Sequence, residues 1–396
     1  MFMKTTNVST GRYWFYFFLL VAAVTFKFSL FFYIVNVIPG AFIEPDSPLY
    51  LQAADSIRDF FLHPGHGLTY TSQAMPGYPL ILAGCLYGLG LLIHQMIFIQ
   101  ILLNFLTAFV VARIARSINP NWAAVSALIV LLDLPLTVYS QLIMTESVFI
   151  LVLSCFILCF HRYLIIPSYR RLIFAVFTLV LCVYIRPIVC YLAWPVAAFI
   201  ICFRCAGHWK KNLAHACLVI LIFYGLCLPW QYRNFKRYGD VRMSSIADRT
   251  FKLHSFFKDS DEKKAGIVPK ASNYIYYPFA FSRNVLELLT TPGSTKHCRS
   301  ISWMTFSKVF GYLLIVFWLP GFLMGLTWGK KDLRYSFLIL IFLYFLFATI
   351  GAVGWTVTSR YRIAMLPSIA VIATAGWFKI RTLFMRLYGF QKESDH

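Results

Sequence analysis

The sequence predicts an all-α, polytopic membrane protein with about ten transmembrane helices. Of its 396 residues, 60% are apolar and only 13% are charged, whereas soluble proteins carry roughly 25% charged residues. Several apolar runs reach the ~20 residues that a helix needs to cross a bilayer. The basic residues, which give a net charge of +21, cluster in short connections between these runs. This distribution is typical of cytoplasmic loops, so we expect membrane lipids and no nucleic acid as partners.

The first apolar run extends from Trp14 to Ile38 and follows Lys4 and Arg12. It is too long for a signal-peptide core and lacks a small-residue cleavage site, so we interpret it as the first span. A single transmembrane domain over residues 1–396 is expected. Its further spans are predicted at about 94–112, 122–139, 145–161, 172–185, 187–203, 213–229, 303–328, 335–352 and 361–378.

The short segment 79–93 decides the number of crossings, because it is apolar but rich in glycine. If it crossed the membrane, every later loop would change sides. If it is interfacial or re-entrant, the basic residues gather on one side, and the short outer segments hold only Arg58, Arg186, Arg360 and Arg362. The positive-inside rule therefore favours ten spans with both termini in the cytoplasm, in a bacterial inner membrane.

Two large outer segments result, 39–93 and 230–302. In the first, Ser47 and Pro48 are predicted as the N-cap and first residue of a helix. Apolar residues follow at helical spacing, which indicates an amphipathic helix on the membrane surface: Leu49, Ala53, Ile57, Phe60 and Phe61. The second segment is expected to be a lid or an acceptor-binding loop.

Acidic residues near the outer ends of spans are candidates for chemistry. Lys27, Asp133 and Glu146 are charged within or at the mouth of spans, where charge is costly and usually functional; pairing inside the bundle is the alternative. Because Ser47 already fills the capping role, Asp46 is left without a structural role, and we interpret it as functional. Glu146 at the start of a span is explained equally well by helix capping.

Arginines on the predicted outer face suggest a phosphate site. Outer-face arginines run against the orientation bias, and guanidinium groups match phosphate geometry. Anchoring at the interface is the ordinary explanation for any single one of them. The candidates are Arg186, Arg233, Arg360 and Arg362.

Signals for a metal are weak, and neither a metal nor a cofactor is expected. Asp259 and Asp261 match a metal–nucleotide spacing but lack a preceding strand and face a compartment without nucleotides. His63 and His66 lie across a turn, as in many polar loops. Cys202 and Cys205 end an apolar helix without a second pair of cysteines.

Taken in order, several short motifs resemble the GT-C-fold glycosyltransferases that use polyprenyl-phosphate sugars. The nearest likenesses are the bacterial dolichol-phosphate-mannose-type and lipid A aminoarabinose or galacturonic acid transferases. The matching residues span most of the chain: Pro45-Asp46-Ser47 with Tyr50, Pro76-Gly77-Tyr78-Pro79, Thr145-Glu146-Ser147, Arg186-Pro187, Pro229-Trp230 with Arg233-Asn234, Tyr238-Gly239, and Arg360-Tyr361-Arg362 with Pro367.

The resemblance implies that Asp46 is the catalytic base and Glu146 a second acid near the acceptor. The outer arginines would meet the lipid phosphate, and we expect Tyr50, Tyr361 and Asp133 to contact substrate. Many relatives carry a lysine where this chain has Met75, so another basic residue must serve the phosphate here. The chain also lacks the extra spans of larger relatives, which leaves the acceptor class open.

The expected function is inverting transfer of a sugar from a polyprenyl-phosphate donor to a hydroxyl of a glycolipid, glycan or protein on the outer, periplasmic face. Because the leaving group is already activated, no metal is needed. A polysaccharide polymerase or ligase using lipid-linked sugars would display similar arginines. A lipid-linked sugar transporter would instead show an internal repeat and midplane charges; we find no repeat, and only Lys27 favours it.

Overall fold

The computed structural model describes residues 10–43, 46–63, 74–203, 209–244, 277–292, 301–327, 332–353 and 359–387, and the elements within them are all helical. A helix occupies each position predicted to span. The predicted all-α membrane fold is therefore confirmed. These helices are α1 (Thr10–Val37), α4 (Ile93–Ile118), α5 (Ala123–Leu132), α7 (Glu146–Ile165), α8 (Tyr169–Ile185), α9 (Ala193–Phe203), α10 (Trp209–Tyr238), α14 (Ile301–Gly325), α15 (Leu333–Val353) and α16 (Leu366–Leu387).

Seven helices of the described residues are long and apolar enough to cross a membrane. They lie in α1, α4, α7, α10, α14, α15 and α16, the last together with the 3₁₀ turn before it. The helices at the other predicted span positions are shorter than the ~20 residues a crossing needs: α5, α8 and α9. The number of ten crossings therefore stays a prediction.

The segment that decides the topology forms a short helix. Helix α3 (Gly77–Ala83) continues into a π-helical turn (Gly84–Gly88), and both together are too short to cross a bilayer. The buried hydroxyl of Tyr78 donates a hydrogen bond of 2.8 Å to Gln100 on α4, which holds α3 against the bundle. These dimensions favour the interfacial or re-entrant interpretation.

Helix α2 (Ser47–Leu62) forms where the amphipathic pattern predicted a helix. Ser47 does not cap it, however, because Ser47 is its first residue and its buried hydroxyl donates to the carbonyl of Ile143 at 3.0 Å. Asp46 holds the N-cap position but makes no side-chain capping bond. The predicted cap was wrong, yet the carboxylate of Asp46 remains unused by the helix.

The predicted span 122–139 is not one helix. It breaks at Asp133, whose extended backbone separates α5 from α6 (Leu134–Tyr139). Pro135 favours the break, because proline lacks the N–H that a continuous helix needs but fits the first turn of the new helix α6, where no such bond is required. The carboxylate of Asp133 then caps α6 by accepting from the amide of Leu136 at 2.8 Å.

Two other boundaries differ from those expected. Helix α10 continues past Pro229 to Tyr238 and ends before Gly239, whose φ of +68° closes the helix without steric cost. The predicted outer segment 230–302 therefore begins as helix, and it also contains α13 (Tyr277–Thr290). Helix α9 begins only at Ala193, since Pro187 starts a 3₁₀ turn.

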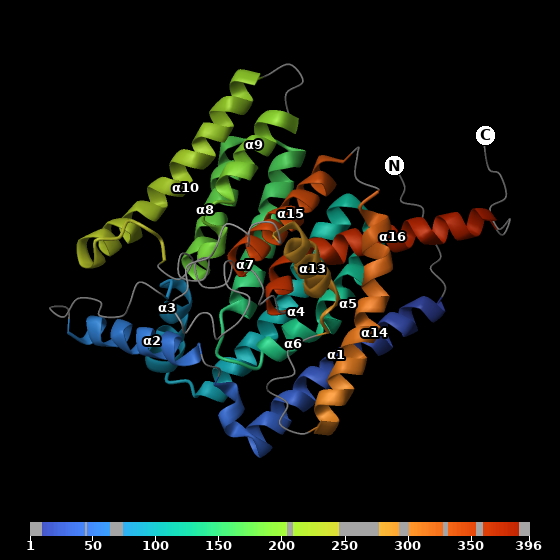
Figure 1. Ribbon diagram of the computed structural model, residues 1–396, viewed down its shortest axis with the longest axis horizontal. Helices are drawn as coiled ribbons and strands as arrows, with labels where there is room; N and C mark the ends of the chain where they lie inside the picture. The colour runs from blue at the N-terminus through green and yellow to red at the C-terminus, as the bar shows by residue number, and fades with distance from the viewer. Residues whose placement is uncertain are drawn as a thin grey trace.

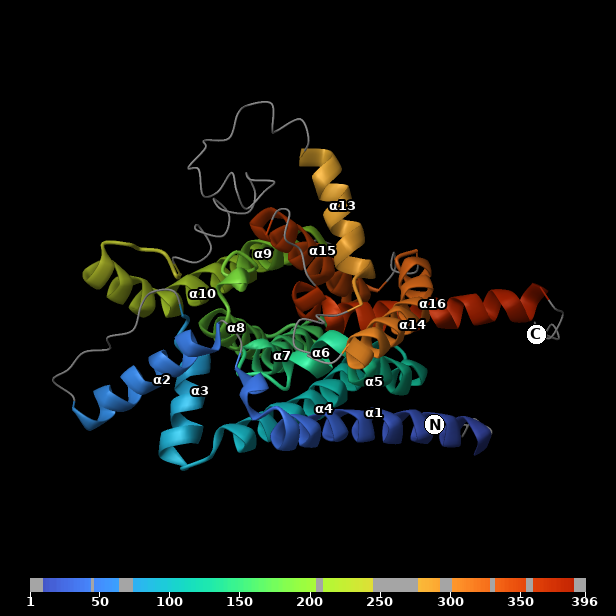
Figure 2. The same ribbon diagram turned by 60° about the horizontal axis from the view of Figure 1, so that its bottom comes forward.

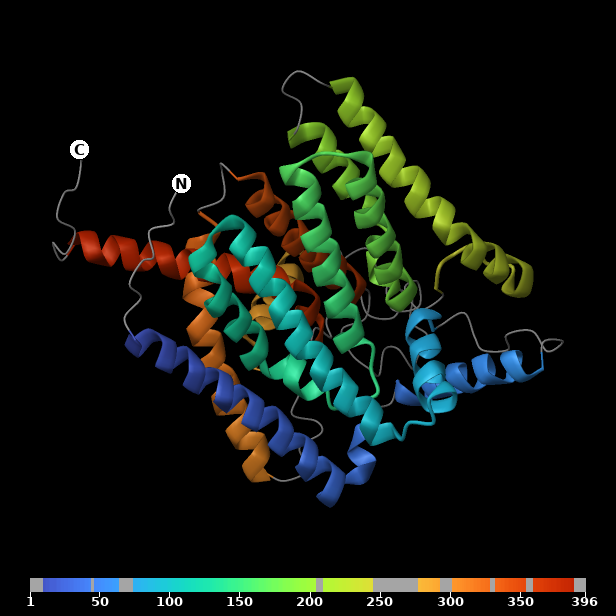
Figure 3. The ribbon, with the colours of Figure 1, turned by 180° about the vertical axis from the view of Figure 1, so that it is seen from behind.

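The helices form two neighbouring groups (Figure 1). Helices α8, α9 and α10 run side by side, and α7 packs against α8. Seen from behind, α4 lies between α7 and α1 (Figure 3). In the turned view, α2 and α3 lie together at one end of α8, and α13 stands over α14 and α15 (Figure 2). One end of α8 is therefore close to α3, and α13 lies over the α14 and α15 side of the molecule.

Helices α14 and α16 cross at glycines. A Cβ on Gly376 would collide with the carbonyl oxygen of Gly321 and approach the amide of Gly325 to 2.5 Å. Small residues allow this close approach, which is how helices commonly associate in membranes. The crossing matters for the site below because α16 carries the 3₁₀ turn Ser359–Met365 at its start.

Gly376→Ala is therefore expected to lower stability by about 2 kcal/mol, because the added methyl meets backbone that cannot rotate away. Thermal unfolding of the purified protein in detergent measures this loss. Gly84→Ala is the matched control, since a Cβ there has no neighbour within 4 Å. Equal unfolding temperatures for the two variants would contradict the close crossing.

Candidate functional site

The site begins at the paired ends of α7 and α8. A short link joins these helices into an antiparallel hairpin, so the first residue of α7 and the residue after α8 lie at the same end. The first is Glu146 and the second is Arg186, and their side chains form an ion pair with Nη1 and Oε1 3.2 Å apart. The first residue of α7 and the residue that follows α8 thus supply one charge each.

Two segments far away in sequence complete this cluster. Arg360, in the 3₁₀ turn Ser359–Met365, donates from Nε to the same Oε1 atom of Glu146. Its Nη1 donates to Oδ2 of Asp46 at 2.9 Å. A continuous series of charges therefore runs from Asp46 through Arg360 and Glu146 to Arg186, and we call these four residues the Glu146 cluster.

Burial divides the roles within the Glu146 cluster. The side chain of Glu146 is fully buried, those of Arg186 and Arg360 are 17% and 18% exposed, and that of Asp46 is 53% exposed. A buried carboxylate between two arginines fixes their positions and balances their charge. Asp46 is the carboxylate of the cluster that a substrate can reach from solvent.

Aromatic rings surround the arginines. The Arg360 guanidinium lies 5.6 Å from the ring centroid of Tyr139, and that of Arg186 lies 5.5 Å from Phe149. These contacts orient planar guanidinium groups. Neither ring was predicted as part of the site, because nothing in the sequence marks these two among so many aromatic residues.

Tyr50 lies near the Glu146 cluster, as the sequence analysis expected of a substrate-site residue. Its ring packs edge-on against Tyr78 at 5.3 Å. Burial and the neighbouring charge of Glu146 raise the pKa of Tyr50, outweighing the opposite effect of Arg360. Its hydroxyl therefore stays protonated near neutral pH and acts as a hydrogen-bond donor. Contact with substrate remains a prediction.

Arg362 and Asp133 belong to a different group, inside the bundle. Arg362 is 2% exposed, and its Nη2 lies 3.9 Å from Oδ2 of Asp133. Its Nη1 donates to three carbonyls at the end of α13, those of Leu288, Leu289 and Thr291, at 3.1, 3.2 and 2.9 Å. The guanidinium thus holds α13 onto the bundle, and the structure does not bring Arg362 to the Glu146 cluster.

Arg362→Gln is expected to cost about 3 kcal/mol of stability, because it removes a buried charge pair and releases α13. Differential scanning fluorimetry in detergent measures the shift. Arg283→Gln is the control, since Arg283 pairs with Glu287 on the exposed side of α13 and surface pairs contribute little. If stability were unchanged and donor binding were weaker, Arg362 would instead contribute to binding the donor phosphate, as the sequence predicted.

Lys27 also lies in this internal group. Its buried ammonium donates to the hydroxyl of Thr137 on α6 at 2.6 Å. This contact holds α1 against α6, and the two alternatives for Lys27, a functional role and charge pairing within the bundle, stay predictions.

Arg233 and Tyr361 are two further predicted site residues. Arg233 lies on α10, where its guanidinium faces the rings of Trp230 and Tyr238 at 4.6 and 5.4 Å. Tyr361 follows Arg360 in the same 3₁₀ turn and is partly buried against the core. Their roles in binding donor and substrate stay predictions.

In the described part of the chain, no group of three or more histidine, cysteine, aspartate or glutamate side chains gathers. Of the weak sequence candidates, Asp259, Asp261, His66 and Cys205 lie outside the described residues.

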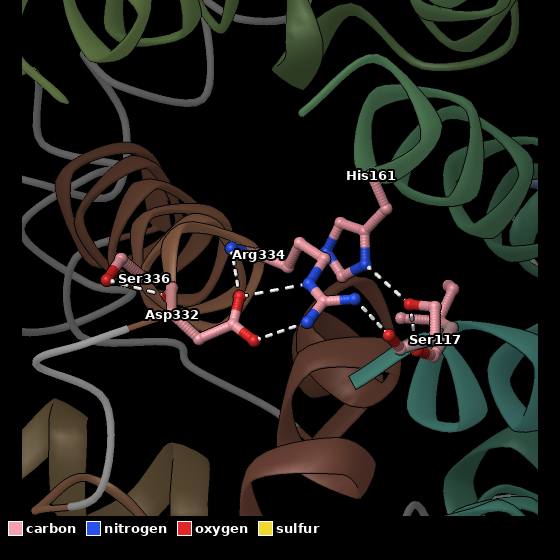
Figure 4. Close-up of polar contacts among 6 residues, drawn as sticks. Ser117, His161, Asp332, Arg334 and Ser336 are labelled. Atoms are coloured by element: carbon pink, nitrogen blue, oxygen red, sulfur yellow. Dashed lines mark hydrogen bonds and ion pairs between the residues drawn. The ribbon is translucent and has the colours of Figure 1, made fainter. Parts of the chain in front are cut away.

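A second polar cluster lies at the opposite end of α7 (Figure 4). Arg334 forms an ion pair of 2.6 Å with Asp332 and donates to the carbonyl of Ser117 at the end of α4. The ring of His161 lies 3.4 Å from the hydroxyl of Ser117. These contacts tie α4, α7 and α15 together, so we assign this cluster a structural role.

Comparison with known proteins agrees with the architecture. The family model for dolichyl-phosphate-mannose-protein mannosyltransferases matches residues 72–232. ArnT from Cupriavidus metallidurans in the apo state superposes with a TM-score of 0.52 at 13% identity, covering 93% of this chain and 63% of that one. The archaeal oligosaccharyltransferase AglB from Archaeoglobus fulgidus, in complex with an inhibitory peptide and a dolichol-phosphate, gives 0.55 at 13%, covering 98% and 53%.

These likenesses show the fold. The chain has the GT-C fold, which confirms the resemblance drawn from the sequence motifs. It spans less than two thirds of the length of either solved structure. No curated protein sequence matches it.

Proposed function

We propose that this protein is a membrane glycosyltransferase that moves a sugar from a polyprenyl-phosphate donor to an acceptor hydroxyl on the outer, periplasmic face. The observation that carries this proposal is the Glu146 cluster. Four segments separated in sequence form the cluster, in which the exposed carboxylate of Asp46 contacts Arg360 and the buried carboxylate of Glu146 holds Arg360 and Arg186 in place. A base beside an anion site is what transfer from a lipid phosphate requires.

In the proposed reaction, Asp46 accepts the proton of the acceptor hydroxyl as that oxygen attacks the anomeric carbon. The bond between this carbon and the phosphate oxygen breaks, and the phosphate leaves with the bonding electrons. Attack from the face opposite the leaving group inverts the anomeric centre. Arg360 and Arg186 balance the charge that develops on the leaving phosphate.

The Asp46–Arg360 contact suggests how the donor prepares the base. Arg360 Nη1 now donates to Asp46 at 2.9 Å. A donor phosphate that takes this place on Arg360 would free the Asp46 carboxylate from this ion pair, beside the sugar. Glu146 keeps Nε of Arg360 in place during this exchange. We therefore propose that Glu146 is a positioning residue, which acts through the arginines.

The proposal is tested by mass spectrometry of glycolipids, glycans and glycoproteins from cells with and without this protein. We expect one sugar modification to disappear and the matching polyprenyl-phosphate sugar to accumulate. The same donor, supplied to the purified protein in detergent with the acceptor so identified, should release polyprenyl phosphate. A protein that exposes the donor to the other leaflet of vesicles without cleaving it would be a transporter, which overturns the proposal.

A further inference from the structure

A groove lies at the end of the α7–α8 hairpin away from the Glu146 cluster. Helix α7 has 20 residues and is therefore roughly 30 Å long, so the groove and the Glu146 cluster lie near opposite membrane surfaces. The cavity has a volume of about 1010 Å³. Its lining includes the last turns of α7 and the first turns of α8.

One side of the groove is strongly basic. Arg162, Arg170 and Arg171 line it, and the described lining residues include no carboxylate. Arg171 is engaged by the fold, because its Nη1 donates to the carbonyls of Arg162 and Ile166 at the end of α7. Arg162 and Arg170 are exposed, and among the described residues neither forms an ion pair. Two guanidinium groups are therefore available to an anion.

The other side of the groove is apolar and faces outward from the bundle. Ile173, Phe174 and Phe177 on α8 line it with 44%, 60% and 48% of their surfaces exposed. Ile165 and Ile166 at the end of α7 are exposed as well. If the α7–α8 hairpin crosses the membrane as the sequence predicts, such a surface contacts lipid chains, whereas arginines at the helix ends lie at the level of the headgroups.

We propose that this groove binds an anionic diacyl phospholipid of the cytoplasmic leaflet. Its phosphate lies between Arg162 and Arg170, and its chains lie along the exposed apolar face of α8. Basic pockets beside membrane helices on the cytoplasmic side recognise anionic headgroups by this combination of charge and apolar contact. The apolar wall favours a lipid over a free phosphate or a soluble anion.

Native mass spectrometry of the full-length protein in detergent tests the proposal. Phosphatidylglycerol should remain bound at lower concentrations than phosphatidylcholine does. In the double variant Arg162→Gln/Arg170→Gln the apparent affinity for phosphatidylglycerol should fall about tenfold, with phosphatidylcholine unaffected. Arg171 is kept because it caps α7.

The matched control is Arg113→Gln/Arg116→Gln, which removes two exposed arginines from α4 on the same predicted side of the membrane, away from the groove. Its affinity should stay within about twofold of the wild type. An equal loss in this control would show attraction by net charge alone and overturn the proposal, as would an unchanged affinity in the double variant. If equimolar glycerol phosphate displaced the phospholipid, the groove would be a site for a soluble anion, and the proposal of a lipid site would be overturned.

Discussion

Asp46→Asn is expected to lower the rate of sugar transfer by about 10²–10⁴-fold, the range typical of losing a general base. The asparagine has nearly the same shape and keeps an oxygen near Arg360, but it cannot accept the acceptor's proton. Because the Asp46 side chain is 53% exposed, its ion pair contributes less than about 1 kcal/mol. The loss should therefore appear in kcat, with stability close to that of the wild type. Release of polyprenyl phosphate by the purified protein measures it.

Asp59→Asn is the control for this variant. Asp59 lies on the same helix, is 56% exposed and pairs with Arg58 instead of with the Glu146 cluster. It should keep wild-type activity. If Asp46→Asn protein transferred sugar at an undiminished rate, the base would have to be another residue.

Glu146→Gln is expected to weaken donor binding about tenfold and to lower stability by about 3 kcal/mol. The neutral amide leaves Arg186 and Arg360 close together without the carboxylate that now balances them. The arginines then repel each other and lose the geometry that suits a phosphate. Thermal unfolding measures the stability, and KM for the lipid donor measures the change at the site.

A double-mutant cycle separates positioning from catalysis by Glu146 itself. If Glu146 acts through Arg360, its effect on KM should largely vanish in an Arg360→Met background, because the group that it positions is gone. Glu146→Asp should restore part of the stability by keeping the charge. A large loss in kcat that persists in the Arg360→Met background would instead make Glu146 a catalytic residue in contact with substrate.

The sequence predicted the helices well because apolar runs and prolines act locally. Each predicted span has a helix, and the break at Asp133 agrees with two local signals, the proline at 135 and the capping carboxylate of Asp133, although one continuous span over 122–139 was predicted. The prediction that Ser47 caps α2 was wrong because of a tertiary contact. Ser47 bonds to the carbonyl of Ile143, a group that local sequence cannot reveal.

By itself, the sequence determined that this protein is an all-α membrane protein with its unusual acids and arginines at one predicted face. Basic residues gather in the loops of one side, and charged residues are rare in lipid-facing helices because they are costly there. Both effects can be read from the amino-acid composition and from the order of residues along the chain. The sequence could not show which arginine pairs with which carboxylate. Arg360 and Arg362 are two residues apart in one turn, and their predicted roles were the same.

Only the tertiary structure separates these two arginines. In the 3₁₀ turn, Arg360 points to Asp46 and Glu146, while Arg362 points to Asp133 and the end of α13. The difference depends on helices that approach from distant parts of the chain. An ion pair forms where two side chains meet in space, and local sequence encodes neither position.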